Sequence, residues 1–172
     1  MIVGLADAPG PWPMIEEIFF LSSSVQTFDS DDARQSFLDA WTGYYRESEP
    51  DGILLYLAPD GRVAGYLTGC RDSKAAIRLY ADIDSYRLFE DRFDAYPAHF
   101  HVNCHPDHRN RGIGGQLVAA FLDDCRGRGI GGVHVVSAEG ARNIGFYRKC
   151  GFEVVARRCW RDRDLVCLGR AP

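Results

Sequence analysis

Hydrophobic positions near the start of the chain recur at the three- and four-residue spacing of helices. The first such segment is 12–21, and the second follows Asp31-Asp32-Ala33, whose acidic residues are predicted to cap the helix. Residues 77–93 are predicted to form a third helical region that ends at Tyr96-Pro97, since proline cannot continue a helix. Three helical regions are therefore expected in the first hundred residues.

Other segments show the short or alternating apolar runs of β-strands. Ile53–Leu57 and Arg62–Gly69 flank Ala58-Pro59-Asp60-Gly61, which is typical of a hairpin turn because proline fixes φ and glycine accepts a left-handed position. Ala98–Cys104 alternates with a period of two. The last forty residues add strands at 133–137, 152–157 and 165–168 and a helix at about 141–150. This order predicts one α+β or mixed α/β domain over residues 1–172, with helices on both sides of a central sheet.

A glycine-rich segment lies between the alternating strand and an amphipathic helix. It reads Arg109-Asn110-Arg111-Gly112-Ile113-Gly114-Gly115, and Leu117, Val118 and Phe121 recur at helical spacing behind it. Glycines allow the backbone to approach an anion closely, and the free amides of a helix N-terminus carry partial positive charge. Arg109 and Arg111 add two full charges. The segment is therefore predicted to bind a phosphate group.

Two common phosphate loops do not fit this segment. Gly115 is followed by Gln116-Leu117, whereas a P-loop needs Lys-Ser/Thr there. The glycine spacing stops short of the dinucleotide fingerprint Gly-x-Gly-x-x-Gly, and no clear acidic residue closes the next strand. What remains is Arg-x-x-Gly-x-Gly after a strand that ends at Cys104-His105-Pro106. This pattern resembles motif A of the GCN5-related N-acetyltransferases, the GNAT superfamily.

A second motif lies about thirty residues further on. The segment Asn143–Phe152 reads NIGFYRKCGF and resembles the Asn-x-x-x-Tyr-x-Lys-x-Gly-Phe signature of motif B in the same superfamily. The resemblance covers about residues 53–168. It implies a single GNAT-like α/β (α+β) domain with a mixed, mostly antiparallel central sheet, and an acetyl-CoA-binding core at about 97–158. The implied reaction is acetyl-CoA-dependent N-acetylation of a primary amine, by direct attack in a ternary complex.

The resemblance also implies the roles of individual residues. The amides of motif A would bind the pyrophosphate of coenzyme A, and the strand before it would pair with pantetheine. Asn143 would bind the pantetheine arm or orient the helix, and Tyr147 would protonate the departing thiolate as a general acid. The predicted cofactor-binding residues are Val102, Asn103, Cys104, Arg109, Asn110, Arg111, Gly112, Ile113, Gly114, Gly115, Gln116, Asn143 and Tyr147.

A base is also required, because the attacking amine must be neutral. His99, His101 and Asn103 share one face of the predicted strand, and Phe100, Val102 and Cys104 share the other. His101 is the first candidate and His99 the second, because an unperturbed imidazole titrates near neutrality. A bulge would reverse this parity and leave a water chain or an acidic residue elsewhere as the base.

The closing segment of the chain is similar to the acetyltransferase-like C-terminal domain of eukaryotic O-GlcNAcases, of which this chain would be a bacterial-type relative. The similarity rests on Phe146–Arg157, Asp164–Arg170 and Tyr96-Pro97-Ala98. Those domains lack the glycine-rich motif A that this chain has, which favours cofactor binding here. The similarity also motivates a second hypothesis, a non-catalytic acyl-CoA-binding or interaction module.

The composition of the chain limits the classes of partner that it is expected to bind. The chain has 172 residues, 46% of them hydrophobic and 26% charged, as expected for a globular protein. Its formal net charge of −4 argues against general nucleic-acid binding, which needs a basic face. The longest apolar run, Ile130–Val136, is too short to span a membrane. Acetyl-CoA and an amine acceptor, either a small molecule or a protein lysine or N-terminus, are the expected partners, and a homodimer is possible.

The six cysteines have no Cys-x-x-Cys spacing, and the N-terminus has no basic region or signal-like apolar stretch. Reduced thiols in a cytoplasmic protein are therefore expected. The pattern His99-x-His101 with His105-x-x-His108 also suggests a metal site. We expect no metal, because no cysteine or carboxylate joins these histidines at a suitable spacing, and the second pair lies on the loop predicted to hold the cofactor.

Overall fold

The computed structural model describes residues 1–172 and divides into two compact units. The first unit comprises Met1–Gly69 and His101–Phe121, and the second comprises Cys70–Phe100 and Leu122–Pro172. Strand β4, Ala98–Cys104, and helix α4, Ile113–Gly127, each contribute residues to both units. The seven strands form one mixed sheet in the order β1-β2-β3-β4-β5-β7-β6, so the predicted fold class is confirmed.

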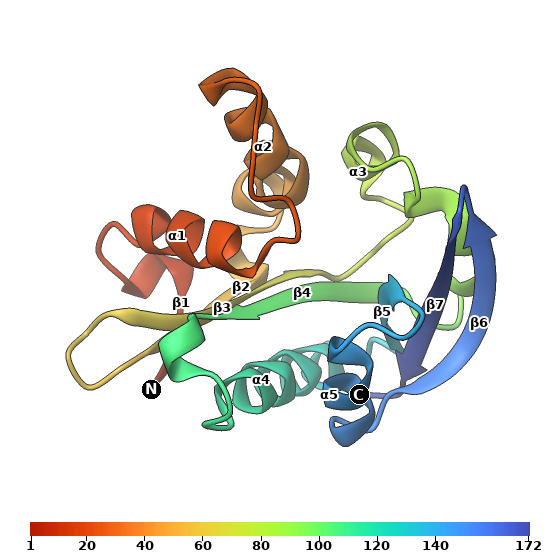
Figure 1. The fold of residues 1–172 in the computed structure, drawn as a ribbon. Coiled ribbons are helices and arrows are strands. Elements are labelled where there is room, and N and C mark those ends of the chain that lie inside the picture. Colours follow the sequence, from red (N-terminus) through yellow and green to blue (C-terminus); the bar gives the residue numbers. More distant parts are fainter. The chain divides into compact units, whose positions relative to one another are not determined.

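The first unit contains helices on both faces of its strands. Figure 1 shows α1 and α2 on one face of β2, β3 and β4, and the start of α4 on the other. The antiparallel pairs begin at β1, where Ile2 is opposite Tyr56, and continue with Leu54 opposite Leu67. Besides β4 and α4, the elements are β1 Ile2–Gly4, η1 Leu5–Asp7, α1 Trp12–Ser22, α2 Asp31–Ser48, η2 Pro50–Gly52, β2 Ile53–Leu57, β3 Val63–Cys70 and η4 Pro106–His108.

The predicted hairpin and the first two helices are confirmed, with one correction at a helix start. Gly61 has a left-handed φ of 80°, and its N–H donates to the carbonyl of Ala58 at 2.9 Å, which closes the turn. Helix α2 is capped by Ser30, whose Oγ accepts a hydrogen bond from the Ala33 N–H at 3.1 Å. Asp31 and Asp32 lie inside the first turn instead. There their carboxylates favour the helix through its dipole rather than as caps.

Two glycines on β3 allow α4 to approach the sheet closely. A Cβ at Gly65 would lie 3.1 Å from both the Sγ of Cys104 and the Cγ2 of Ile113, and a Cβ at Gly69 would overlap the ring of Phe121. Because these positions carry no side chain, the side chains of Ile113 and Phe121 on α4 can pack against the strand backbone. The opposite face of β3 carries Tyr66 and Thr68, as the two-residue period of a strand requires.

The second unit joins β4 to three further strands. Ala98 pairs with Val133 and His99 with His134 in parallel, whereas β5 pairs antiparallel with β7, and β7 with β6. The elements are α3 Ile77–Asp82, η3 Tyr86–Arg92, β5 Val133–Ala138, α5 Asn143–Lys149, β6 Glu153–Trp160 and β7 Arg163–Arg170. The mixed and mostly antiparallel sheet expected from the sequence is therefore present.

The helical region predicted at 77–93 is broken into two shorter helices. Helix α3 ends where Ile83 adopts an extended conformation, with φ −126° and ψ 101°. The chain then re-enters a 3₁₀ helix at Tyr86, whose hydroxyl donates to the carbonyl of Ser73 at 2.9 Å and whose ring lies edge-on to His99. These tertiary contacts of Tyr86 override the helical propensity of the segment.

Candidate functional site

The glycine-rich loop leads directly into the N-terminus of α4. Asn110 and Gly112 both have left-handed backbone conformations, with φ of 60° and 78°. The N–H of Gln116 donates to the carbonyl of Gly112 at 3.0 Å, which closes the first turn, so the earlier N–H groups have no acceptor within the helix. Turns with left-handed residues and the positive end of a helix dipole are both features of anion sites. The loop therefore has the backbone geometry of a phosphate cradle.

Arg109 links this loop to two neighbouring segments of the first unit. Its Nε donates to the carbonyl of Cys104 at 3.2 Å, and its guanidinium also donates to the Oγ of Ser22 at 3.2 Å. The side chain is exposed, as is that of Arg111. Both guanidinium groups are thus available to an anion in solvent.

Burial raises the pKa of the Cys104 thiol, although the charge of Arg109 and the N–H of Gly114 act in the opposite direction. Cys104 is therefore a neutral thiol that packs beneath the loop.

A cavity of about 200 Å³ lies in the first unit on the face of β3 opposite α4. Its wall includes His101 and Asn103, so the predicted sharing of one strand face holds for these two residues. The amide of Asn103 donates to the hydroxyl of Tyr66 at 2.9 Å. The lining residues are Phe19, Ser22, Ser23, Ser24, Phe37, Trp41, Tyr66, Thr68, His101 and Asn103.

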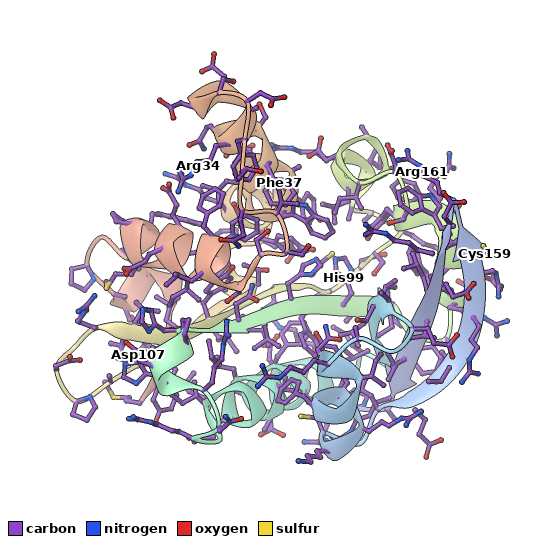
Figure 2. The ribbon with its side chains drawn as sticks, in the orientation of Figure 1. Arg34, Phe37, His99, Asp107, Cys159 and Arg161 are labelled. Atoms are coloured by element: carbon purple, nitrogen blue, oxygen red, sulfur yellow. The ribbon has the colours of Figure 1, made fainter.

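Aromatic side chains hold His101 in this wall. The rings of Trp41 and Tyr45 lie edge-on to the imidazole, with centroids 5.5 and 5.7 Å away. The ring of Phe19 on α1 and that of Phe37 on α2 lie 5.5 Å apart, and Figure 2 shows Phe37 on α2. His101 is only half-buried. Its imidazole is thus oriented by packing while part of its surface stays accessible to a ligand.

The other candidate base, His99, lies in a filled part of the second unit and is labelled in Figure 2. Ser73 Oγ donates to the carbonyl of Pro97 at 2.6 Å and lies 2.7 Å from Nδ1 of His99. Because the serine hydrogen is used by the carbonyl, Nδ1 of His99 is the donor in the second bond. His134 lies beside His99, with ring centroids 5.5 Å apart. The Ser73 hydroxyl is fully buried, and His99 is 5% exposed.

His134 completes this buried cluster. Its Nδ1 donates to the carbonyl of Tyr96 at 2.7 Å, and its ring stacks on Phe93. Burial lowers the pKa of His134 to about 4, although hydrogen bonds to the carbonyls of Tyr96 and Ala98 act in the opposite direction. His134 is therefore neutral at neutral pH and serves packing and hydrogen bonding.

Tyr147 lies on α5 in the second unit and is almost fully buried. Burial raises the pKa of its hydroxyl to about 12, and a side-chain hydrogen bond with Asn143, one helical turn earlier, partly opposes this shift. The rings of Phe100 and Phe152 lie edge-on to it at 6.2 and 6.3 Å. The phenol consequently keeps its proton over the physiological pH range, as a general acid must before it reacts.

A residue that the sequence pattern missed orients Asn143. Ser137, at the end of β5, donates through its Oγ to the Oδ1 of Asn143 at 2.7 Å. This bond assigns the oxygen of the amide and leaves the NH₂ group of Asn143 for other acceptors. The signal in the sequence was a polar residue near the end of the strand that precedes the second motif. The sequence pattern also missed Trp41, Tyr66 and Thr68. Each lies in a segment whose hydrophobic pattern predicts only packing in the core.

Comparison with known proteins identifies the family. A sequence model described as the acetyltransferase (GNAT) family matches residues 12–152. This match covers most of the chain, and the chain belongs to that family. It is accordingly an acyltransferase, as the two motifs predicted.

Solved structures share the fold over almost the whole chain. The crystal structure of SsHAT matches with a TM-score of 0.81 at 20% identity, covering 99% of this chain and 97% of that one. The ribosomal-protein-alanine N-acetyltransferase from Brucella melitensis matches at 0.62 with 20% identity, covering 100% and 99%. A phosphinothricin acetyltransferase from Sinorhizobium meliloti, solved in complex with AcCoA, matches at 0.60 with 18% identity, covering 99% and 87%. At these identities the likeness establishes the fold alone.

The helices and the possible metal-binding side chains of the chain bear on other partners. None of its helices combines the length and apolar composition needed to cross a membrane. No group of three or more His, Cys, Asp or Glu side chains is arranged to hold a metal ion. The expectation that the chain needs no metal remains a prediction.

Proposed function

We propose that the chain is an acetyl-CoA-dependent N-acetyltransferase that acts on a primary amine by direct attack in a ternary complex. The observation that carries the proposal is the loop at the start of α4, where left-handed Asn110 and Gly112 precede amides that have no acceptor within the helix, inside the matched family region. Acetyl-CoA-bound structures with the same fold add support. Acetyl-CoA, when bound, supplies an acetyl group activated as a thioester.

The residues of the chain divide the work of binding and proton transfer. The loop amides and the guanidinium groups of Arg109 and Arg111 bind the pyrophosphate, and the backbone of Val102–Cys104 pairs with pantetheine. His101 accepts a proton from the attacking amine as its nitrogen bonds to the acetyl carbon. Tyr147 donates its hydroxyl proton to the sulfur as the carbon–sulfur bond breaks. Asn143 and Ser137 keep the phenol in position.

The Tyr147→Phe variant tests the general acid. We expect the rate of thiol release from acetyl-CoA to fall about 100-fold, because a positioned acid typically contributes 10² or more. The dissociation constant of acetyl-CoA, measured by calorimetry, is expected to change less than threefold. The control is Tyr80→Phe, which removes a phenol from α3 whose hydroxyl is 3.4 Å from Glu90. Equal rates for the wild type and Tyr147→Phe would exclude the acid role.

A second candidate function is a non-catalytic acyl-CoA-binding module, favoured by the similarity of the closing segment to the O-GlcNAcase C-terminal domain. It predicts saturable binding of acetyl-CoA without thiol release for any amine in a broad panel. Thiol release from acetyl-CoA therefore distinguishes the two functions. Failure to bind acetyl-CoA would exclude both.

A further inference from the structure

The wall of the cavity in the first unit contains apolar and neutral polar side chains but no charged one. Three aromatic side chains, Phe19, Phe37 and Trp41, form its apolar part. The polar part consists of hydroxyl, amide and imidazole groups. None of the ten lining residues is an Asp, Glu, Lys or Arg. The wall therefore offers hydrogen bonds and apolar faces, but no charge to pair with an ammonium group.

Thr68 gives the cavity a polar group that is unsatisfied by the protein. Its side chain is 1% exposed, it lines the cavity, and its Oγ1 has no hydrogen-bond partner. An unpaired buried hydroxyl costs about 1 to 3 kcal/mol, so such a group in a native protein commonly pairs with a ligand or an ordered water. The hydroxyl of Tyr66 accepts from Asn103, and its own hydrogen remains for a second partner.

We propose that this cavity holds the acceptor and that the acceptor is a small polyhydroxylated primary amine, an amino sugar. The inference rests on the proposed acetyl transfer. Aromatic rings pack on the C–H faces of a sugar ring, while the hydroxyls of Ser22, Thr68 and Tyr66 match the sugar hydroxyls. Transfer of a long alkyl ammonium into the cavity would instead remove water from a charge that no carboxylate compensates.

Size and basicity agree with this class of acceptor. A cavity of about 150 Å³ holds one benzene ring, so about 200 Å³ is suited to one six-membered ring with its substituents. Electron-withdrawing hydroxyl groups lower the pKa of a neighbouring amine below that of a lysine, which titrates at about 10.4. A larger fraction of such an amine is neutral at physiological pH. His101 in the cavity wall then meets the acceptor amine more often in its neutral, reactive form.

The first test compares acceptors of matched size. Thiol release from acetyl-CoA is measured with glucosamine, with cyclohexylamine and with 1,5-diaminopentane. We expect kcat/KM for glucosamine to exceed the other two at least tenfold. An equal or higher kcat/KM for either alkyl amine would overturn the inference and leave the proposed function standing. If no amine releases thiol, the proposed function fails, and calorimetry with coenzyme A present decides the inference: glucosamine must bind more tightly than cyclohexylamine.

The second test removes the unpaired hydroxyl. Thr68→Val is expected to raise the KM for glucosamine about tenfold, since one hydrogen bond to the ligand is lost, while kcat changes less than twofold. Its midpoint of thermal unfolding should not fall, because the hydroxyl has no partner in the protein. The matched control is Thr42→Val on α2, whose hydroxyl donates to the carbonyl of Leu38 at 2.7 Å outside the cavity wall. An equal change in KM for both variants would refute the role of Thr68.

Discussion

His101 and His99 lie two residues apart on strand β4, yet their surroundings differ in almost every respect. His101 is half-buried in the wall of a cavity, held edge-on by Trp41 and Tyr45. His99 is 5% exposed, with its Nδ1 bonded to Ser73 and its ring against Tyr86 and His134. The imidazole of His101 lines a cavity, whereas that of His99 is buried against protein groups.

The difference shows that the face of a strand does not by itself define a site. The alternation of side chains puts both histidines on the same side of β4. What each one meets is decided by the segments packed on that side, which are α1 and α2 in the first unit and residues 73–93 in the second. The same residue type thus serves a cavity in one unit and a core in the other.

Replacement of His101 is expected to give the largest effect. In His101→Gln the rate of thiol release should fall about 100-fold, or about 2.7 kcal/mol, because the base is lost. The free energy of unfolding in urea should change by less than about 0.5 kcal/mol, since the side chain is half-buried. A rate within threefold of the wild type would remove His101 as the base.

Replacement of His99 should instead lower the stability of the protein and leave the rate of thiol release almost unchanged. In His99→Ala we expect the free energy of unfolding to fall by about 2.5 kcal/mol, from the lost packing and the lost hydrogen bond from Nδ1 to the Ser73 hydroxyl, which keeps its bond to the carbonyl of Pro97. The rate per folded molecule should stay within threefold of the wild type. A double-mutant cycle with Ser73→Ala should show a coupling of about 1 kcal/mol. A large loss of rate in a stable His99→Ala protein would instead make His99 the base.

Acid should destabilise the second unit through His134. The pKa of His134 is lowered in the folded state from 6.5 to about 4, so the stability it contributes is present above pH 6.5 and is lost as the pH falls toward 4. Between pH 7.5 and 5 the free energy of unfolding should fall by about 2 kcal/mol.

Urea titrations at both pH values measure this change. The His134→Gln variant keeps a donor near the carbonyl of Tyr96 but does not titrate, so its loss over the same range should be smaller by about 2 kcal/mol. The same acid dependence in the variant would show that other groups cause it.

The sequence predicted the elements whose pattern is local. The hairpin at Ala58–Gly61, the strand at Ala98–Cys104 and the helix after the glycine loop each follow from periodicity and turn chemistry within a short window. β1 was missed because three residues are too few to show a period. The break in the segment 77–93 was missed because it depends on the contacts of Tyr86 with Ser73 and His99, which lie outside the segment in the chain.

The sequence predicted the cofactor-binding part of the candidate site, but it did not predict the cavity. The cofactor loop and Tyr147 belong to continuous motifs, and a continuous motif is visible in a single sequence. The cavity combines residues from α1, α2, β3 and β4. Thr68 in particular lies in a buried run where nothing in the sequence distinguishes a hydroxyl that lacks a partner from one that has one. Only the packing of the helices on that face reveals it.

The bare backbone at Gly69 has a consequence for how this chain can change over generations. Any side chain there meets the ring of Phe121, so the two positions form a coupled pair in which neither can vary freely alone. A lineage that gains a methyl group at 69 must first accept a smaller residue at 121 and tolerate the resulting void. The order of these two substitutions is therefore constrained, and the path through the smaller residue at 121 is the accessible one.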